Sequence, residues 1–226
     1  MTSWNIAGLS ATKRKQSLTA PINSRPRPLL RFSYQERLPR GRSGHPDAAG
    51  ALTGRVLPVE HLRKVVDWAR ERGAVVASDE CYAELGWAEQ PVSLLHPDVC
   101  GGAYDNLLVL YSLSKQSNLA GYRAAFAAGD PALVGALLQA RKHAGMIVPT
   151  PVQAAMVAAL GDDAHVAEQR QRYARRRDSL REALEGNGFR IDDSAAGLYL
   201  WASRDEDCWV TVADLAARGG LVAPGS

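Results

Sequence analysis

One lysine of this chain stands among residues that together could do covalent chemistry. Residues 106–123 read NLLVLYSLSKQSNLAGYR, an apolar run followed by a hydroxyl-rich turn that carries Lys115. A lysine that is partly desolvated beside another cation has its neutral amine form favoured, and a neutral amine can attack a carbonyl to form a Schiff base. Lys115 is therefore the candidate nucleophile.

Three side chains around Lys115 suit a phosphate group. Ser112 and Ser114 stand just before the lysine, and Arg123 follows it eight residues later. Arginine offers a rigid fork of donors, and serine adds short hydrogen bonds without charge. An aldehyde that carries a phosphate is pyridoxal phosphate, so these residue types together predict a site for that cofactor.

A second apolar run ends in the acid that this cofactor requires. Residues 73–82 read GAVVASDECY, in which Asp79 follows the apolar residues and Tyr82 comes three positions later. Pyridoxal phosphate works as an electron sink when an acidic partner keeps its ring nitrogen protonated. Asp79 is the candidate for that partner. Taken alone, a carboxylate at a strand end also fits a helix cap or a surface charge, and a lone SxSK also fits an ordinary loop.

Together these motifs resemble the class I and II aminotransferases of pyridoxal-phosphate fold type I. Members of that family carry D-x-x-Y and then S-x-S-K-x-x-x-L-x-G-x-R, and this chain has SDECY and SLSKQSNLAGYR with a spacing of 36 residues from Asp79 to Lys115. The resemblance implies that Lys115 forms the Schiff base, that Asp79 holds the pyridinium nitrogen and that Tyr82 bonds the phenolic oxygen. It also implies that the phosphate is held by Ser112, Ser114 and Arg123.

The run from about residue 53 to the end looks like the actinobacterial succinyldiaminopimelate aminotransferase group. It includes RKHAGMIVPTPVQAAMVAAL and SAAGLYLWAS. The resemblance implies transfer of an amino group, with glutamate as the expected donor, to a keto acid in lysine and diaminopimelate biosynthesis. It further implies a cytoplasmic homodimer with small amino acids and keto acids as its partners. A noncatalytic fragment with weak cofactor binding, and a carbon–sulfur lyase of the same fold, remain alternatives.

The elements that must position these residues follow an α/β pattern. Residues 58–73 place apolar side chains on one face and predict a helix, whereas the apolar runs 74–78 and 107–111 predict strands buried on both faces. Residues 122–128 predict a further strand. Ligands of such sheets bind at the carboxyl ends of the strands. We therefore expect a partial pyridoxal-phosphate transferase fold type I, with a mostly parallel sheet under helical cover.

The second half of the chain predicts helices and the start of a small α+β domain. Asp130 with Pro131, and Thr150 with Pro151, each predict a capped helix start. A long polar helix over residues 162–185, two short strands at 189–191 and 198–202, and a helix at 211–218 follow. The predicted parts are an irregular segment 1–52, a partial large cofactor-binding domain 53–161, and a linking helix with a partial small domain 162–226.

The first fifty residues differ in composition from the rest. They hold nine Lys and Arg against two acids, while the remainder holds eighteen against twenty-two. Five prolines and the lack of periodicity predict disorder or irregular coil, and patterns typical of a transit peptide or a nucleic-acid arm are weak. We hypothesise that residues 1–52 come from a different reading frame. We also expect truncation at both ends relative to the family, with exposed apolar faces on residues 74–77 and 107–110.

The remaining composition argues against several other classes of protein. No run of 18 apolar residues exists to span a membrane, and the net charge is only +3. The three cysteines form no CxxC pair, so the sequence predicts neither a zinc site nor a disulfide framework, and a reducing cytoplasm fits. The arginines of residues 170–177 are expected to form a solvated helix face rather than a nucleic-acid site.

Overall fold

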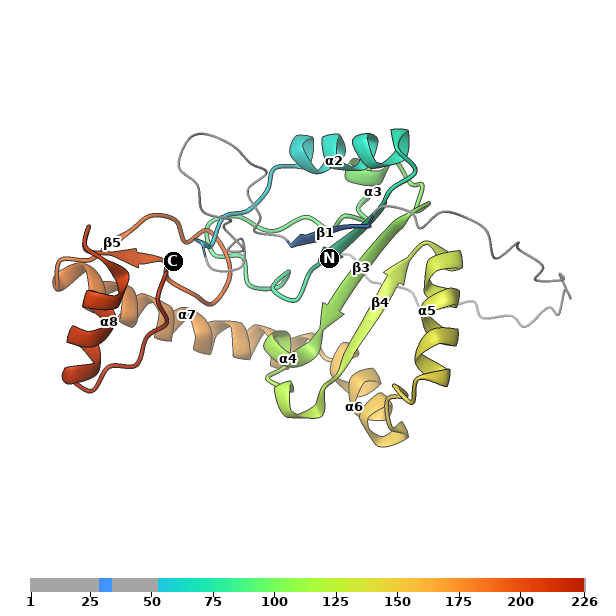
Figure 1. Cartoon of the computed structure of the whole chain (residues 1–226). Coiled ribbons are helices and arrows are strands. Elements are labelled where there is room, and N and C mark those ends of the chain that lie inside the picture. The colour runs from blue at the N-terminus through green and yellow to red at the C-terminus, as the bar shows by residue number, and fades with distance from the viewer. Residues whose placement is uncertain (1–28, 34–52, 226) are drawn as a thin grey trace, which may run out of the picture.

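The computed structural model describes residues 29–33 and 53–225 of the chain. Within them, strands and helices alternate and build a four-stranded sheet in the order β1-β2-β3-β4 (Figure 1). The strands are β1 (Leu29–Ser33), β2 (Val75–Asp79), β3 (Leu107–Ser112) and β4 (Ala125–Gly129). The first three run parallel, and β4 runs antiparallel to β3. The predicted α/β fold with a mostly parallel sheet is confirmed.

Strand β1 comes from the segment for which the sequence predicted irregular coil. It pairs with β2 in parallel register along its five residues, so the prediction is wrong there. Five residues are too few to show a periodicity, whereas the open edge of β2 has backbone donors and acceptors that need partners. The rest of residues 1–52 lies outside the described residues. The irregular coil and the different reading frame therefore stay predictions for that part.

Helices α2 (Val59–Glu71) and α3 (Pro97–Cys100) cover one face of the sheet (Figure 1). The buried side of α2 is the apolar face that the sequence predicted, and it packs against both central strands and α3. The cluster is formed by Leu62, Val65, Val66, Ala69, Ala74, Val76, Leu94, Val99, Cys100, Leu107 and Val109. The core of the protein therefore lies between α2 and strands β2 and β3.

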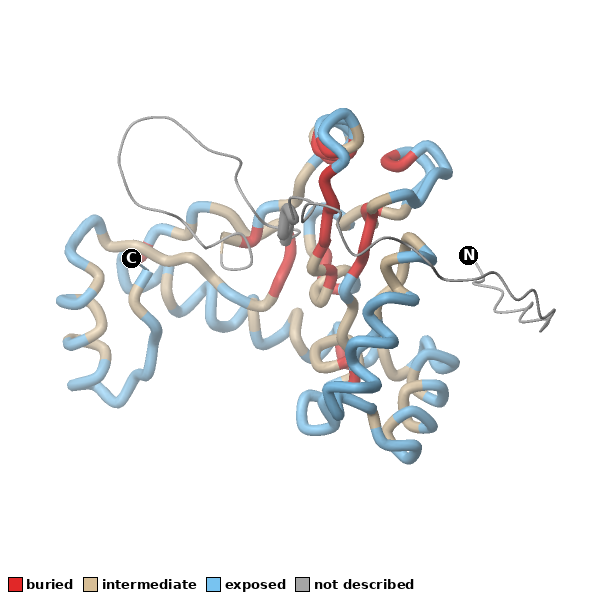
Figure 2. The backbone as a smooth tube through the Cα atoms, turned by 45° about the vertical axis from the view of Figure 1, so that its right-hand side comes forward, coloured by how far each residue is buried: buried red, intermediate tan, exposed pale blue. Residues whose placement is uncertain are grey.

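The central strands are covered more completely than the sequence suggested. Residues 74–77 and 107–109 are buried, and only Leu110 of the two runs has an exposed side chain, at 37%. The expectation of exposed apolar faces is therefore wrong for these runs. On one face of the sheet the cover comes from α2 and α3, which pack against Ala74, Val76, Leu107 and Val109. Figure 2 shows the buried residues gathered in this part of the molecule.

The chain then continues through helices α5 (Pro131–His143), α6 (Thr150–Leu160) and α7 (Asp163–Gly186). The carboxylate of Asp130 caps α5 as predicted, and Asp162 caps α7 in the same way. The predicted cap at Thr150 is wrong, because Thr150 is already the first helical residue and Pro149 precedes it. A proline disfavours helical geometry in the residue before it, but only as a tendency. Here Thr150 is helical although Pro151 follows it, so α6 begins one residue earlier than predicted.

Helix α7 leads to a small unit at the other end of the molecule (Figure 1). It consists of β5 (Arg190–Ile191), antiparallel to β6 (Ala202–Ser203), and of α8 (Cys208–Ala217). The strand predicted at 198–202 is therefore largely wrong, since only residue 202 of that range pairs. The last helix starts three residues earlier than predicted because Asp207 caps it. Within the described ranges, no helix combines the length and the apolar character that a bilayer crossing needs.

The buried position of Leu107 in β3 gives a test of this core. Leu107→Ala should lower the free energy of unfolding by about 3 kcal/mol, because the substitution loses packing and leaves a cavity. Urea denaturation followed by circular dichroism measures the change. Leu138→Ala is the matched control, since Leu138 on α5 is 63% exposed and its loss should cost less than about 0.5 kcal/mol. Equal losses would contradict this location of the core.

Candidate active site

The carboxyl ends of β2 and β3 lie side by side at one edge of the sheet. Asp79 is the last residue of β2 and pairs in register with Leu110, two residues before the end of β3 at Ser112. Strand β4 runs back from the same edge, with Ala125 opposite Ser112. Arg123, two residues before β4, therefore also lies at this edge. The structure thus brings together residues that are up to 44 positions apart in sequence.

Helix α4 (Leu113–Gln116), which carries Lys115, begins directly after β3. Ser112 is its N-cap, and its Oγ accepts a hydrogen bond from the Ser114 N–H at 3.2 Å. The same hydroxyl lies 2.8 Å from Ser114 Oγ and 3.3 Å from the Ala124 carbonyl oxygen. The Leu113 N–H also donates to the Ala124 carbonyl, at 3.1 Å. These bonds hold the two hydroxyls together and tie the start of the β3–β4 connection to its end.

The carboxylate of Asp79 stabilises the turn that follows β2. Its Oδ1 accepts a hydrogen bond from the Cys81 N–H at 3.2 Å. This local bond is of the kind that the helix-cap alternative predicts. A carboxylate has two oxygens with about four acceptor sites, so the bond is compatible with a second role for the group at the sheet edge.

The next residue, Glu80, is a buried acid that sequence reasoning did not single out. It is only 3% exposed, and its Oε1 accepts a hydrogen bond from the Leu94 N–H at 2.8 Å. Its own N–H donates to the Leu110 carbonyl at 2.8 Å. Successive side chains of an extended segment point to opposite faces of the sheet. This alternation is the sequence signal that Asp79 and Glu80 lie on different faces and have different surroundings. Glu80 therefore anchors the loop around Leu94 to the sheet.

The half-buried thiol of Cys81 is within electrostatic range of both the candidate acid and the candidate lysine. Burial first, and the Asp79 carboxylate next, raise the pKa of Cys81 to about 12, although the Ser112 backbone and the Lys115 charge partly oppose the rise. Lys115 itself stands three residues after the end of β3, on α4, and its charge acts on this thiol. The predicted Schiff-base lysine and its predicted acidic partner thus share one region.

The Tyr82 ring is in edge contact with the ring of Tyr199, which comes from the segment before β6. The ring centroids are 6.4 Å apart and the planes make an angle of 67°. Burial raises the pKa of the Tyr82 hydroxyl, and the nearby Tyr199 hydroxyl is the next cause. Tyr82 therefore keeps its proton at neutral pH and is able to donate a hydrogen bond.

The position of Arg123 depends on an unusual backbone conformation. A short 3-10 turn, η1 (Ala120–Tyr122), ends at Arg123, whose φ of 54° is in the left-handed region. Such conformations are uncommon for residues other than glycine and concentrate at functional sites. This turn also explains why the strand predicted from Tyr122 begins only at Ala125. The exposed guanidinium donates to the Ala120 carbonyl at 3.2 Å through Nη1.

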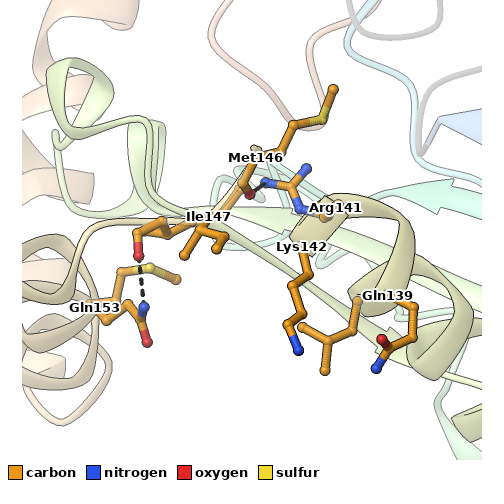
Figure 3. A pocket seen from close by; sticks show the side chains of 10 residues that line it. Gln139, Arg141, Lys142, Met146, Ile147 and Gln153 are labelled. Atoms are coloured by element: carbon orange, nitrogen blue, oxygen red, sulfur yellow. Dashed lines mark hydrogen bonds between the residues drawn. The ribbon is translucent and has the colours of Figure 1, made fainter. Parts of the chain in front are cut away.

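A hollow of about 520 Å³ lies next to this edge of the sheet, between α5 and α6 (Figure 3). It is lined by Ala125, Leu138, Gln139, Arg141, Lys142, Met146, Ile147, Val148, Gln153 and Met156. Arg141 and Gln153 each donate to a carbonyl of the connection between the helices, those of Met146 and Val148. None of the residues predicted to bind the cofactor lines this hollow, although Ala125 pairs with Ser112 across the sheet.

The donor set at the sheet edge fits pyridoxal phosphate. A carboxylate suits the ring nitrogen, a protonated phenol suits the phenolic oxygen, and two hydroxyls with a guanidinium suit the phosphate. An amine for the aldehyde stands among them. The residues that would play these parts are Asp79, Tyr82, Ser112, Ser114, Lys115 and Arg123. These individual roles remain predictions.

The fold is that of the pyridoxal-phosphate transferases of fold type I, and the chain belongs to the class I and II aminotransferases. The model of the family "Aminotransferase class I and II" matches residues 50–223. Members of this family depend on pyridoxal phosphate, which confirms the predicted cofactor.

Among its relatives is the 4-dedimethylamino-4-oxo-anhydrotetracycline transaminase OxyQ of Streptomyces rimosus. The two are 65% identical over 173 residues, which are 76% of this chain and 48% of OxyQ. The probable aminotransferase Rv1178 of Mycobacterium tuberculosis is 64% identical over 76% of this chain and 41% of its own length. The chain thus spans about half the length of the relatives that it matches.

A solved structure, that of N-succinyldiaminopimelate aminotransferase from Mycobacterium tuberculosis, has the same fold. It superposes with a TM-score of 0.71 over 87% of this chain and 48% of that chain, at 24% identity. At this identity the likeness shows the fold alone. It agrees with the predicted fold type and leaves the substrate to be argued separately.

The raised pKa of Cys81 predicts a thiol that resists alkylation. With a pKa of about 12, only about one thiol in ten thousand is ionised at pH 8, and the thiolate is the reactive form. We expect Cys81 to react with iodoacetamide at least about ten times more slowly than Cys208, the other half-buried cysteine. Peptide mapping by mass spectrometry measures both rates. Equal rates in the folded chain would contradict the placement of Cys81, whereas urea should abolish the difference.

Proposed function

We propose that this chain carries the catalytic centre of a pyridoxal-phosphate-dependent aminotransferase. The observation that carries the proposal is the meeting of Asp79, Ser112, Lys115 and Arg123 at one edge of the sheet, in a chain of this family. Residues 53–161 would then be part of the large cofactor-binding domain. The region from residue 162 onward would be the linking helix and part of the small domain.

The residues of the site would divide the work of the reaction as follows. Bound pyridoxal phosphate supplies an electron sink for the electrons released at the α-carbon of the amino acid. Asp79 would hold the proton on the ring nitrogen by its charge, and Tyr82 would donate a hydrogen bond to the phenolic oxygen. The phosphate would be fixed by the Ser112 and Ser114 hydroxyls and by Arg123.

Lys115 would have two functions in turn. Its amine would first bond to the aldehyde carbon and keep the cofactor in place. Once an amino acid displaces it, the same amine would remove the α-proton and return it to another carbon, as general base and then general acid. Its position on a one-turn helix between two strand ends suits this second task, because the backbone around it is held by the bonds of Ser112 and Leu113 to Ala124.

For the substrates, we propose glutamate as donor and two candidate acceptors. The first is an N-succinyl keto acid of lysine and diaminopimelate biosynthesis, favoured by the resemblance of the sequence and compatible with the fold shared with N-succinyldiaminopimelate aminotransferase. The second is a 4-oxo compound of the anhydrotetracycline type, favoured by the 65% identity with OxyQ. We further propose a homodimer in a reducing cytoplasm, in keeping with the free cysteines of the described chain.

The assignment of Lys115 has a direct chemical test. Borohydride reduction of the chain loaded with pyridoxal phosphate should fix the cofactor on the peptide that contains Lys115. Lys115→Ala should abolish this labelling, because the amine that bonds the aldehyde is gone. Lys64→Ala, on the exposed side of α2, is the control and should be labelled like the original chain. Cofactor fixed on Lys64 or on Lys142 would overturn the assignment.

The proposed reaction and its alternatives differ in their products. With glutamate, the loaded chain should release about one equivalent of 2-oxoglutarate in a single turnover, measured by mass spectrometry, with Lys115→Ala as the inactive control. The two candidate acceptors are then compared by the aminated product that each gives. Cofactor binding without 2-oxoglutarate would favour a noncatalytic fragment. Release of ammonia and pyruvate from a cysteine conjugate would favour a carbon–sulfur lyase.

A further inference from the structure

The short helix that carries Lys115 is tied at its far end to the strand before it. Helix α4 follows β3 directly (Figure 1), and its last residue is Gln116, the neighbour of the lysine. The hydroxyl of Tyr111 on β3 donates a hydrogen bond to Gln116 Oε1 at 2.6 Å, a good length for a bond from a hydroxyl to an oxygen. This bond connects the end of the lysine helix back to the strand.

Helix α4 depends on such outside support because it is very short. It has four residues, and a single helical turn is not stable by itself. Its beginning is held by the Ser112 cap and by the bond of the Leu113 N–H to the Ala124 carbonyl. The bond from Tyr111 to Gln116 supports its other end, directly after Lys115.

Tyr111 is itself held firmly in the sheet. It pairs with Phe126 of β4 in the register of the two strands. The two rings stack with their centroids 5.2 Å apart and their planes at 27°, a favourable arrangement for an aromatic pair. Burial raises the pKa of the Tyr111 hydroxyl, so the group keeps its proton at neutral pH. Tyr111 is therefore a fixed donor for the side chain of Gln116.

We propose that Tyr111 is a positioning residue for Lys115, and that it acts by holding Gln116 and with it the end of α4. This inference rests on the proposed function, in which the Lys115 amine bonds to the aldehyde carbon of pyridoxal phosphate. The amine must reach one carbon atom of a cofactor that other side chains fix in place. A bond of this kind forms readily only when the reacting group is held in the right geometry.

The first experiment measures how readily Lys115 bonds to the cofactor. Each chain is equilibrated with increasing concentrations of pyridoxal phosphate and reduced with borohydride, and the labelled Lys115 peptide is quantified by mass spectrometry. Four chains are compared: the original, Tyr111→Phe, Gln116→Met and the double variant. Tyr111→Phe keeps the ring that stacks on Phe126, and Gln116→Met keeps the length of the side chain without its amide oxygen.

We expect each single variant to need about five times more cofactor for half-maximal labelling, which corresponds to the loss of one neutral hydrogen bond. The double variant should need no more than either single variant, because both substitutions remove the same bond. Independent effects would multiply to about 25-fold. Such a multiplication, or unchanged labelling in Tyr111→Phe, would overturn the positioning role.

A second experiment separates the positioning of the amine from general damage to the site. Equilibrium dialysis measures the binding of pyridoxal phosphate to Lys115→Ala, with and without Tyr111→Phe. We expect equal affinities, because no amine remains to be positioned. If Tyr111→Phe weakened binding about five-fold in this background as well, Tyr111 would support the site as a whole and the positioning role would be wrong.

Two control variants complete the comparison. Tyr104→Phe makes the same chemical change on a tyrosine that is 44% exposed and precedes β3. Val66→Ala removes packing from the fully buried side of α2 and lowers the stability of the chain. In the folded protein, both should be labelled on Lys115 like the original. A loss of labelling in Val66→Ala equal to that of Tyr111→Phe would assign the effect to stability and reject the proposal.

The same labelling distinguishes this inference from the proposed function. If borohydride fixes no cofactor on Lys115 of the original chain, the proposed function is wrong and the positioning role is wrong with it. If the cofactor is fixed on Lys115 equally well in all four chains, the assignment of Lys115 stands and only the role of Tyr111 is rejected.

Discussion

The parallel pairing of β2 with β3 is the constraint on which the site depends. Because the register sets Asp79 beside Leu110, the carboxylate at the end of one strand and the lysine turn after the other meet at one edge. A shift of one residue would turn Asp79 to the other face and bring Glu80 in its place. The core between α2 and these strands holds this register, so packing that is remote from the candidate site determines which acid ends β2 beside the lysine turn.

Much of this arrangement was readable from the sequence because the decisive signals are local. The apolar runs at 74–78 and 107–111, the helix before them and the cap at Asp130 all appear within a few residues of the predicted places. The motif from Ser112 to Arg123 identified the family, which its match to the aminotransferase family confirms. Patterns of this kind depend on neighbouring residues and need no knowledge of the rest of the chain.

The errors arise where distant residues decide the structure. Strand β1 exists because β2 offers an edge, which no property of LLRFS reveals. The buried Glu80 acquires its meaning from Leu94, and the contact of Tyr82 with Tyr199 joins positions 117 residues apart. The start of β4 was predicted too early because Arg123 adopts a left-handed backbone, a conformation that residue type alone does not predict. Composition and periodicity contain none of these relations.

The antiparallel direction of β4 has a consequence for how the site forms. The connection between β3 and β4 leaves and returns at the same sheet edge, and Leu113 and Ser112 close it by bonding Ala124. Lys115 and Arg123 thus lie on one short connection between two antiparallel strands. Closing a loop of so few residues costs little conformational entropy. Contacts of low sequence separation are typical of proteins that fold fast. The half of the candidate site that carries Lys115 and Arg123 is therefore a local unit of the chain, whereas Asp79 joins it through the long-range pairing of β2 with β3.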